Sequence, residues 1–185
     1  MFYRIIVLVL MLLFLAGCKM LDLNDPNNDA SAAKANVNLG FAFLKQGFAK
    51  EAKQKFLYAK KLDVYEPAVW YGIAYWYEVV GNYAAARSHY EKAISLNPLG
   101  GAAHNNFGAF LCRIKQYEVA MQQFDLAVKD DNYLDMGVAY ENAGICALHI
   151  KDKNCAREYF IKALKFDSAL VYSKLYLGQR AKVSL

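Results

Sequence analysis

Small, aromatic and polar positions recur along this chain with a period of 34 residues, broken by one two-residue insertion near residues 135–136. The small residues fall 34, 34, 36 and 34 positions apart, at Gly40, Ala74, Gly108, Gly144 and Gly178. An aromatic column keeps the same rhythm at Phe56, Tyr90, Phe124 and Phe160. Two alanine columns keep it at Ala52, Ala86, Ala120 and Ala156, and at Ala59, Ala93, Ala127 and Ala163. Self-similarity at a fixed period predicts a repeat architecture, in which each copy is one supersecondary unit.

Each copy predicts two antiparallel helices joined by a short turn. Small residues in the Gly40 and Ala52 columns let the two helices approach closely, and the aromatic column fills the space between copies. Asn97-Pro98 ends one second helix, because proline cannot continue it. No copy can bury its apolar face alone, so neighbouring copies must stack. The predicted fold is an all-α superhelix (α-solenoid) over residues 32–185, with copies at 33–66, 67–100, 101–134 and 137–170 and a partial copy at 171–185.

The N-terminal residues follow a different pattern. Basic Arg4 precedes an apolar run over residues 5–15, and two small residues follow it. This is the pattern of a secretory signal peptide, which we assign to residues 1–17, and the run is short for a membrane span. Residues 18–31 are rich in asparagine and aspartate and can bury little apolar area. We expect them to form a flexible tether.

The tetrad Leu15-Ala16-Gly17-Cys18 resembles the bacterial lipobox. That resemblance implies cleavage before Cys18, diacylglycerol and a further acyl chain such as palmitate on Cys18, and no other cofactor. Residue 19 is lysine rather than aspartate, and in enteric-type sorting this implies the outer membrane. The resemblance therefore implies a lipid-anchored protein of the outer membrane that faces the periplasm.

Composition and charge exclude several function classes. The chain is 57% hydrophobic with a formal charge of +5, but acids and bases are interspersed, so no nucleic-acid-binding stripe is expected. There is no glycine-rich phosphate loop, no histidine pair on one helix and no nucleophile elbow, and the three histidines lack metal-ligand spacing with the cysteines. The nearest approach to a catalytic pair is Cys146 with His149. We therefore expect neither an enzyme nor a small-molecule substrate.

Three cysteines remain beyond Cys18, and an oxidising periplasm favours pairing where geometry allows it. Cys112 and Cys146 fall on the first helices of adjacent copies, which pack side by side. We predict a disulfide between them that clamps the third copy to the fourth. The alternative is two buried thiols that act as small apolar residues. Cys155 is left over at the start of a second helix.

The first helices of a stack line its concave face, and their outward positions predict a protein-binding groove. Asparagine recurs at one such position, at Asn38, Asn106 and Asn142, and an amide can both donate to and accept from a peptide backbone. These asparagines could instead bond their own scaffold, and the aromatic residues could be inter-repeat core. The candidate groove residues are Phe41, Lys45, Tyr71, Tyr75, Asn105, Asn106, Arg113, Glu141 and Asn142.

The 34-residue period and its columns resemble the tetratricopeptide repeat, with the best copy at residues 67–100. Residues 105–112 and 140–148, together with the lipobox, resemble the PilF/PilW family of type IV pilus biogenesis lipoproteins. This resemblance implies a pilotin-like scaffold whose protein partner is the pilus secretin, supporting secretin assembly or localisation. The alternative is an adaptor of another envelope machine, in outer-membrane protein assembly or cell-wall synthesis.

Overall fold

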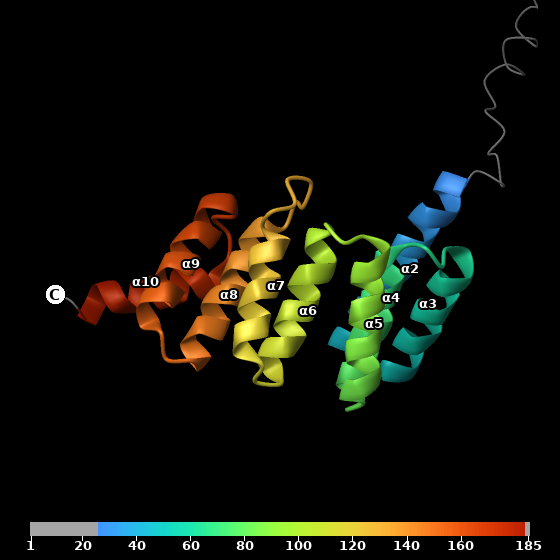
Figure 1. Cartoon of the computed structure of the whole chain (residues 1–185), viewed down its shortest axis with the longest axis horizontal. Coiled ribbons are helices and arrows are strands. Elements are labelled where there is room, and N and C mark those ends of the chain that lie inside the picture. Colours follow the sequence, from blue (N-terminus) through green and yellow to red (C-terminus); the bar gives the residue numbers. More distant parts are fainter. Residues whose placement is uncertain (1–25, 184–185) are drawn as a thin grey trace, which may run out of the picture.

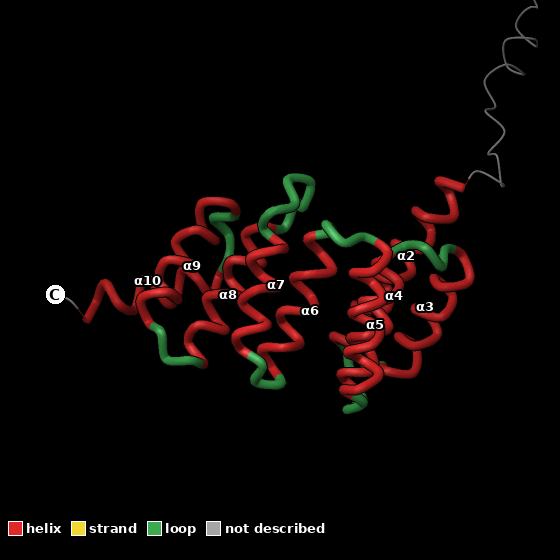
Figure 2. The backbone as a smooth tube through the Cα atoms, viewed as in Figure 1, coloured by secondary structure: helices red, strands yellow, loops and turns green. Residues whose placement is uncertain are grey.

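The computed structural model describes residues 26–183, with side chains placed for residues 29–178, and every regular element in that part of the chain is a helix (Figures 1 and 2). The helices follow one another in a row and form an elongated stack. Their bounds are α2 Pro26–Lys45, α3 Ala49–Leu62, α4 Pro67–Val79, α5 Tyr83–Leu96, α6 Gly101–Arg113, α7 Tyr117–Ala127, α8 Met136–His149, α9 Lys153–Phe166 and α10 Val171–Val183. The predicted all-α solenoid is confirmed.

The helices pair as the sequence period requires. The pairs α2–α3, α4–α5, α6–α7 and α8–α9 make the most extensive contacts, and α10 stands as the first helix of a fifth unit against α9. We call the first helix of each pair helix A and the second helix B. Adjacent A helices also touch, at α2–α4, α4–α6 and α6–α8. The A helices therefore form a continuous layer, on which side chains from successive repeats can meet.

The small and aromatic columns pack against each other inside each repeat. A Cβ placed on Gly40, Gly108 or Gly144 would lie 2.5, 2.9 or 2.6 Å from the aromatic ring of helix B, at Phe56, Phe124 or Phe160 respectively. Real Cβ atoms do not approach that closely, so glycine at these positions is a condition of the packing. The alanines of both alanine columns are fully buried. The residues that recur in the sequence are thus the residues at which helix A and helix B make their closest contacts.

The A-to-B turns use a left-handed residue in all four repeats. Gly47 and Gly81 take φ of 84° and 81°, as expected for glycine, but Lys115 and Lys151 take φ of 65° and 64° at the equivalent place. In each turn the N–H of the residue directly after the left-handed one donates to a carbonyl near the end of helix A, as from Asn82 to Tyr77. This bond is a typical helix C-terminal motif.

The predicted tether is wrong at its C-terminal end, because α2 begins at Pro26 and residues 26–31 are helical. Proline is well accommodated in the first turn of a helix, and the alanines from Ala30 onward favour helix. Residues 1–25, which include the predicted signal peptide, Cys18 and the rest of the tether, lie outside the described residues. Among those that are described, no helix is both long and apolar enough to cross a membrane.

Candidate protein-binding groove

A hollow of about 430 Å³ lies across helices α2, α4, α6 and α8. Its floor is made by the A-helix layer, and its lining mixes aromatic, amide and cationic side chains. We call this hollow the groove, and its lining residues are Phe41, Lys45, Tyr75, Asn105, Asn106, Ala109, Arg113, Val138 and Asn142. Seven of the nine residues proposed from the sequence lie here together; Tyr71 and Glu141 do not.

The aromatic end of the groove is organised around Phe41. Its ring lies 5.5 Å from that of Phe56, 6.1 Å from Tyr71 and 5.7 Å from Tyr75, measured between centroids. Phe56 and Tyr71 support Phe41 from within the stack, while Tyr75 shares the groove lining with it. The rings are therefore held in place before any partner arrives, so little side-chain entropy remains to be lost on binding.

Tyr71 belongs to a neighbouring hollow of about 660 Å³ that also contacts Asn38, Glu66 and the loop over residues 130–135. Burial raises the pKa of the Tyr71 hydroxyl to about 12, and the nearby carboxylates of Glu66 and Asp135 add to the shift. The hydroxyl therefore stays neutral at physiological pH. Tyr71 lies on the A-helix layer, as predicted, but its side chain lines this second hollow and not the groove.

The asparagines are partly committed to the scaffold. Nδ2 of Asn142 donates to Oδ1 of Asn105 over 3.0 Å, and Nδ2 of Asn105 donates to the Tyr133 hydroxyl over 3.0 Å. Nδ2 of Asn106 donates to the Ala102 carbonyl of its own helix over 2.8 Å. Asn105, only 6% exposed, therefore serves the scaffold. Asn106 and Asn142 keep carbonyl oxygens that accept no bond from the described residues.

Tyr133, which was not predicted from the sequence, supports the groove from outside it. It lies in the loop between α7 and α8, the place of the two-residue insertion, and packs within 2.7 Å of where a Cβ on Gly101 would sit. The Asp130 carboxylate of the same loop accepts from the Gly101 N–H over 2.8 Å. The insertion thus folds back over the start of α6 and supports Asn105. The break in the period was the only sequence signal for it.

Arg113 at the other end of the groove is held by Glu78. Its Nε donates to Oε1 of Glu78 and its second nitrogen donates to Oε2 over 2.8 Å, while the Tyr90 hydroxyl donates to Oε2 over 3.3 Å. The guanidinium also lies 5.8 Å from the ring of Tyr75. Through these contacts Arg113 bridges α4 and α6 and supports the ring of Tyr75. Burial, with the Glu78 carboxylate adding to it, raises the pKa of the Tyr90 hydroxyl well above its usual range.

Lys45 is the cation of the groove that has no acidic partner within 4 Å among the described residues. Glu141, by contrast, points to the last helix. Its Oε1 accepts from the Ser173 N–H over 2.8 Å and from the Ser173 hydroxyl over 2.9 Å. The assignment of Glu141 to the groove is therefore wrong. Its carboxylate holds the start of α10 through the two bonds from Ser173, which is fully buried.

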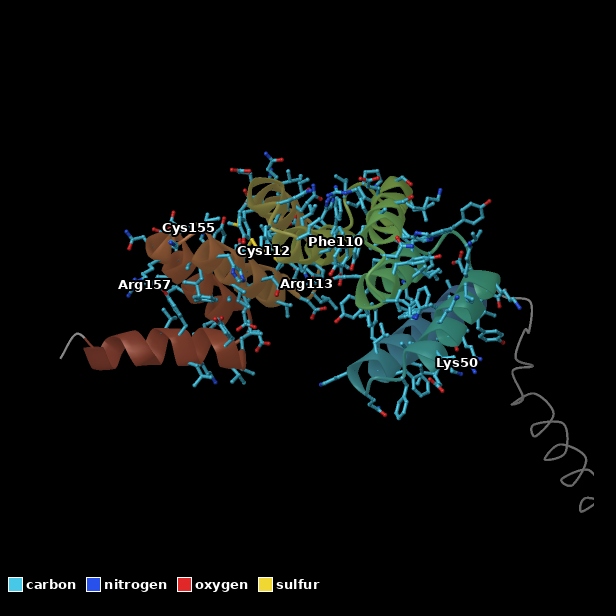
Figure 3. All side chains as sticks on the ribbon, turned by 90° about the horizontal axis from the view of Figure 1, so that it is seen from below. Lys50, Phe110, Cys112, Arg113, Cys155 and Arg157 are labelled. Carbon is cyan, nitrogen blue, oxygen red and sulfur yellow. A yellow bond between two sulfur atoms is a disulfide. The ribbon has the colours of Figure 1, made fainter. Side chains whose placement is uncertain are left out.

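The cysteines cross-link the A-helix layer close to the groove. Cys112 on α6 and Cys146 on α8, the predicted pair, form a disulfide with 5.8 Å between Cα atoms (Figure 3). Because the Cys146 sulfur is used in this bond, it cannot act with His149, which stacks on Tyr117 at 6.0 Å. Cys155 carries a free thiol whose pKa is raised by partial burial and by Asp152, Glu158 and Asp125. A raised pKa disfavours the reactive thiolate.

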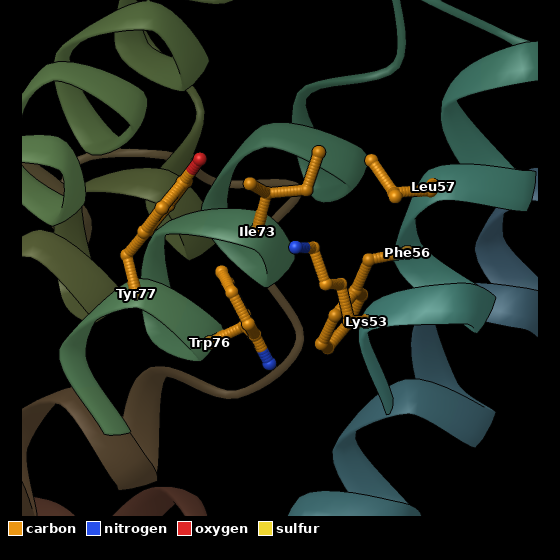
Figure 4. Close-up of a pocket in the computed structure, with 6 residues that line it drawn as sticks. All are labelled: Lys53, Phe56, Leu57, Ile73, Trp76 and Tyr77. Atoms are coloured by element: carbon orange, nitrogen blue, oxygen red, sulfur yellow. The ribbon is translucent and has the colours of Figure 1, made fainter. Parts of the chain in front are cut away.

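Two other features of the described residues were considered as ligand or metal sites, and neither has the required space or side chains. A hollow of about 20 Å³ between α3 and α4, drawn in Figure 4, has room for about one water molecule. Trp76 closes it with its indole N–H bonded to the Ala49 carbonyl and Lys53 over its ring, as packing rather than as a binding residue. Within residues 26–183, no group of three or more His, Cys, Asp or Glu side chains is placed to hold a metal ion.

Comparison with known proteins gives consistent matches. The tetratricopeptide repeat family matches residues 67–99. An uncharacterized protein of Haemophilus influenzae is 34% identical over 140 residues, covering 76% of this chain and 78% of that protein. The type IV pilus assembly protein PilF of Pseudomonas aeruginosa is 29% identical over 136 residues, covering 74% of this chain. The chain spans about half of that PilF, 54% of its length.

Solved structures agree with the sequence relatives. The structure of Pseudomonas aeruginosa PilF superposes with a TM-score of 0.72 at 26% identity, covering 82% of this chain and 68% of PilF. PilW, a type IV pilus biogenesis factor, shares the fold with a TM-score of 0.63 at 24% identity, covering 80% and 70%. The chain therefore belongs to the tetratricopeptide repeat proteins and, among them, is PilF/PilW-like.

Proposed function

We propose that this chain is a lipid-anchored periplasmic scaffold of the outer membrane that supports type IV pilus biogenesis in a pilotin-like role. In this proposal a segment of the pilus secretin binds along the groove. The observation that carries it is the convergence of seven residues from four A helices on one hollow that contains aromatic, amide and cationic groups. The sequence relationship to PilF supports the choice of machine.

The chemistry of the groove suits an extended protein segment. The free carbonyl oxygens of Asn106 and Asn142 can accept backbone N–H groups, and their remaining amide hydrogens can donate to backbone carbonyls. Phe41 and Tyr75 offer a fixed apolar surface of the kind that dominates protein interfaces. Lys45 can meet a carboxylate of the partner. All of these groups bind and orient, and the proposal requires no covalent chemistry.

The anchor is the part of this proposal that the sequence alone supports. Cys18→Ala removes the thiol that would receive the lipid, so we expect the unlipidated protein to leave the outer-membrane fraction. Multiple acyl chains contribute about 0.8 kcal/mol per buried CH₂, so the loss should be nearly complete. Fractionation with a blot measures it. Unchanged outer-membrane fractionation of the Cys18→Ala protein would disprove the anchor.

The functional test is secretin assembly. We expect deletion of the gene to remove secretin multimers from unboiled outer-membrane extracts run on a gel, and a lipidated wild-type copy to restore them. A Tyr75→Ala, Asn142→Ala copy should restore markedly fewer multimers at equal protein level, whereas the control Gln122→Ala, on the exposed side of α7, should restore them fully. Normal multimers and pili in the deletion strain would contradict the proposed role.

A further inference from the structure

The two edges of the solenoid differ. Because the A helices run parallel, the loops from each helix B to the next helix A lie along one edge, the upper one in Figure 2, and the A-to-B turns lie along the other. We call these the loop edge and the turn edge. The five most exposed large apolar side chains of the described residues, between 58% and 95% exposed, all lie at the loop edge. They are Tyr65, Leu99, Leu134, Phe166 and Val171.

The large apolar side chains of the turn edge are less exposed, between 45% and 54%, at Phe48, Val79, Val80, Tyr83 and Ile150. The most exposed of them among the described residues is Tyr83, at 54%. Leu134, at 95% exposure, and Leu99, at 79%, stand almost entirely in solvent. Exposed leucines on loop tips are costly in water, at about 25 cal/mol per Å² of apolar area. A row of them along one edge indicates a surface that is covered in use.

The loop tips are held in position. The Asp63 carboxylate accepts from the N–H of Tyr65 over 2.8 Å, and the Asn97 side chain accepts from the N–H of Leu99 over 3.3 Å. Asp130 and Asp167 make the same bond in the remaining two loops, to Asn132 and Ala169. Each loop thus satisfies a backbone N–H internally, which lowers the cost of moving that loop into a less polar environment.

Lysines and aromatic rings flank the tips. Lys60 and Lys92, near the ends of α3 and α5, lie 4.6 and 5.9 Å from the ring of Trp70, and Lys162 lies 5.7 Å from the ring of Tyr140. None of these lysines has an acidic partner within 4 Å among the described residues. Ammonium groups beside aromatic rings, with apolar side chains beyond them, are typical of surfaces at the boundary between water and lipid headgroups. The loops themselves carry only one lysine, Lys129, so the other cations of this edge come from the helix ends. The loop carboxylates are those of Asp63, Glu66, Asp130, Asp131, Asp135 and Asp167.

We propose that the loop edge lies against the lipid surface to which the chain is anchored, with Leu99 and Leu134 inserted at the headgroup level. This inference rests on the proposed lipid at Cys18. Helix α2 has 20 residues and is about 30 Å long, and it begins at the loop-edge end. The eight residues from Cys18 to Pro26 can span at most about 28 Å. With the turn edge against the membrane, Pro26 would stand about 30 Å above the surface, at the limit of that reach, so the anchor favours the loop edge.

Site-specific labels on the full lipidated chain in vesicles test this inference. An environment-sensitive fluorophore is placed by Leu99→Cys or Leu134→Cys, and the matched controls at the exposed turn edge are Gln46→Cys and Lys153→Cys. All carry Cys155→Ser, so that the label is unique. The vesicles contain phosphatidylethanolamine with phosphatidylglycerol as the minor component. Only protein that floats with the vesicles is measured, so a failure of the anchor appears separately, as protein that does not float, and overturns this inference too.

We expect labels at 99 and 134 to emit at shorter wavelength and to be quenched by lipid-borne nitroxide at least several-fold more than labels at 46 and 153. Equal quenching at both edges would overturn the inference. Shielding of residues 99 and 134 from an aqueous quencher without quenching from the lipid would also overturn it, because it would mean that a second copy of the chain covers the edge. Either result leaves the secretin test of the proposed function unaffected.

Discussion

Phe124→Ala is expected to lower the free energy of unfolding by about 3–5 kcal/mol. The ring is 1% exposed and fills the space between α6 and α7, where a Cβ on Gly108 would lie only 2.9 Å from it. Alanine would remove the contacts of the whole ring and leave a cavity lined by rigid helices. Repeat proteins are stabilised by contacts between neighbours, so a defect in the third repeat also weakens its junctions with the second and fourth.

The matched control for this change is Phe166→Ala at the end of α9. That ring is 58% exposed and, among the described residues, stacks on Tyr140 at 5.5 Å, so we expect a loss below about 1 kcal/mol. Urea unfolding followed by the helical circular dichroism signal measures the free energy of unfolding of both variants. Equal effects of the two substitutions would mean that the aromatic column does not carry the packing.

Loss of the Cys112–Cys146 bond is expected to lower the free energy of unfolding by about 3–4 kcal/mol, as in Cys112→Ala with Cys146→Ala. The bond closes a loop with a sequence separation of 34 residues, so it restricts the unfolded chain strongly. It also joins α6 and α8, two of the helices that line the groove. Thermal unfolding of the wild-type and double-variant proteins measures the difference.

Cys155→Ser is the control, because the thiol is free and half-buried and its replacement removes no cross-link. Thiol labelling of the lipidated protein without reductant should modify Cys155 and no other cysteine. Labelling at Cys112 and Cys146 as well would show that the two sulfurs are not joined, and the expected loss of stability would then not occur.

Much of this fold follows from the sequence because the repeats must satisfy the same contact in every copy. Gly108 and Phe124 are paired in the sequence by the period and in space by a contact that no larger residue permits. The same regularity placed Tyr75, Asn106 and Asn142 on successive A helices, so their meeting in one groove could be predicted before the structure.

Features that do not repeat from copy to copy could not be predicted from the period. The loop that carries Tyr133 contains the two-residue insertion, and it packs over the start of α6 with hydrogen bonds to Asn105 and Gly101. Glu141 lies outside the groove because its carboxylate accepts two hydrogen bonds from Ser173 in α10. A long polar side chain has several hydrogen-bond partners within reach. The repeat period predicts the helix face on which the residue lies, but not which of those partners its side chain binds.

We propose that the groove, and not another face, binds the protein partner. A photo-crosslinking residue at Ala109 in the groove, compared with one at Gln122 on the exposed side of the same repeat, tests it in living cells. We expect a crosslink to the pilus secretin from position 109 and none from position 122. A secretin crosslink of equal strength from both positions, or from position 122 alone, would contradict it.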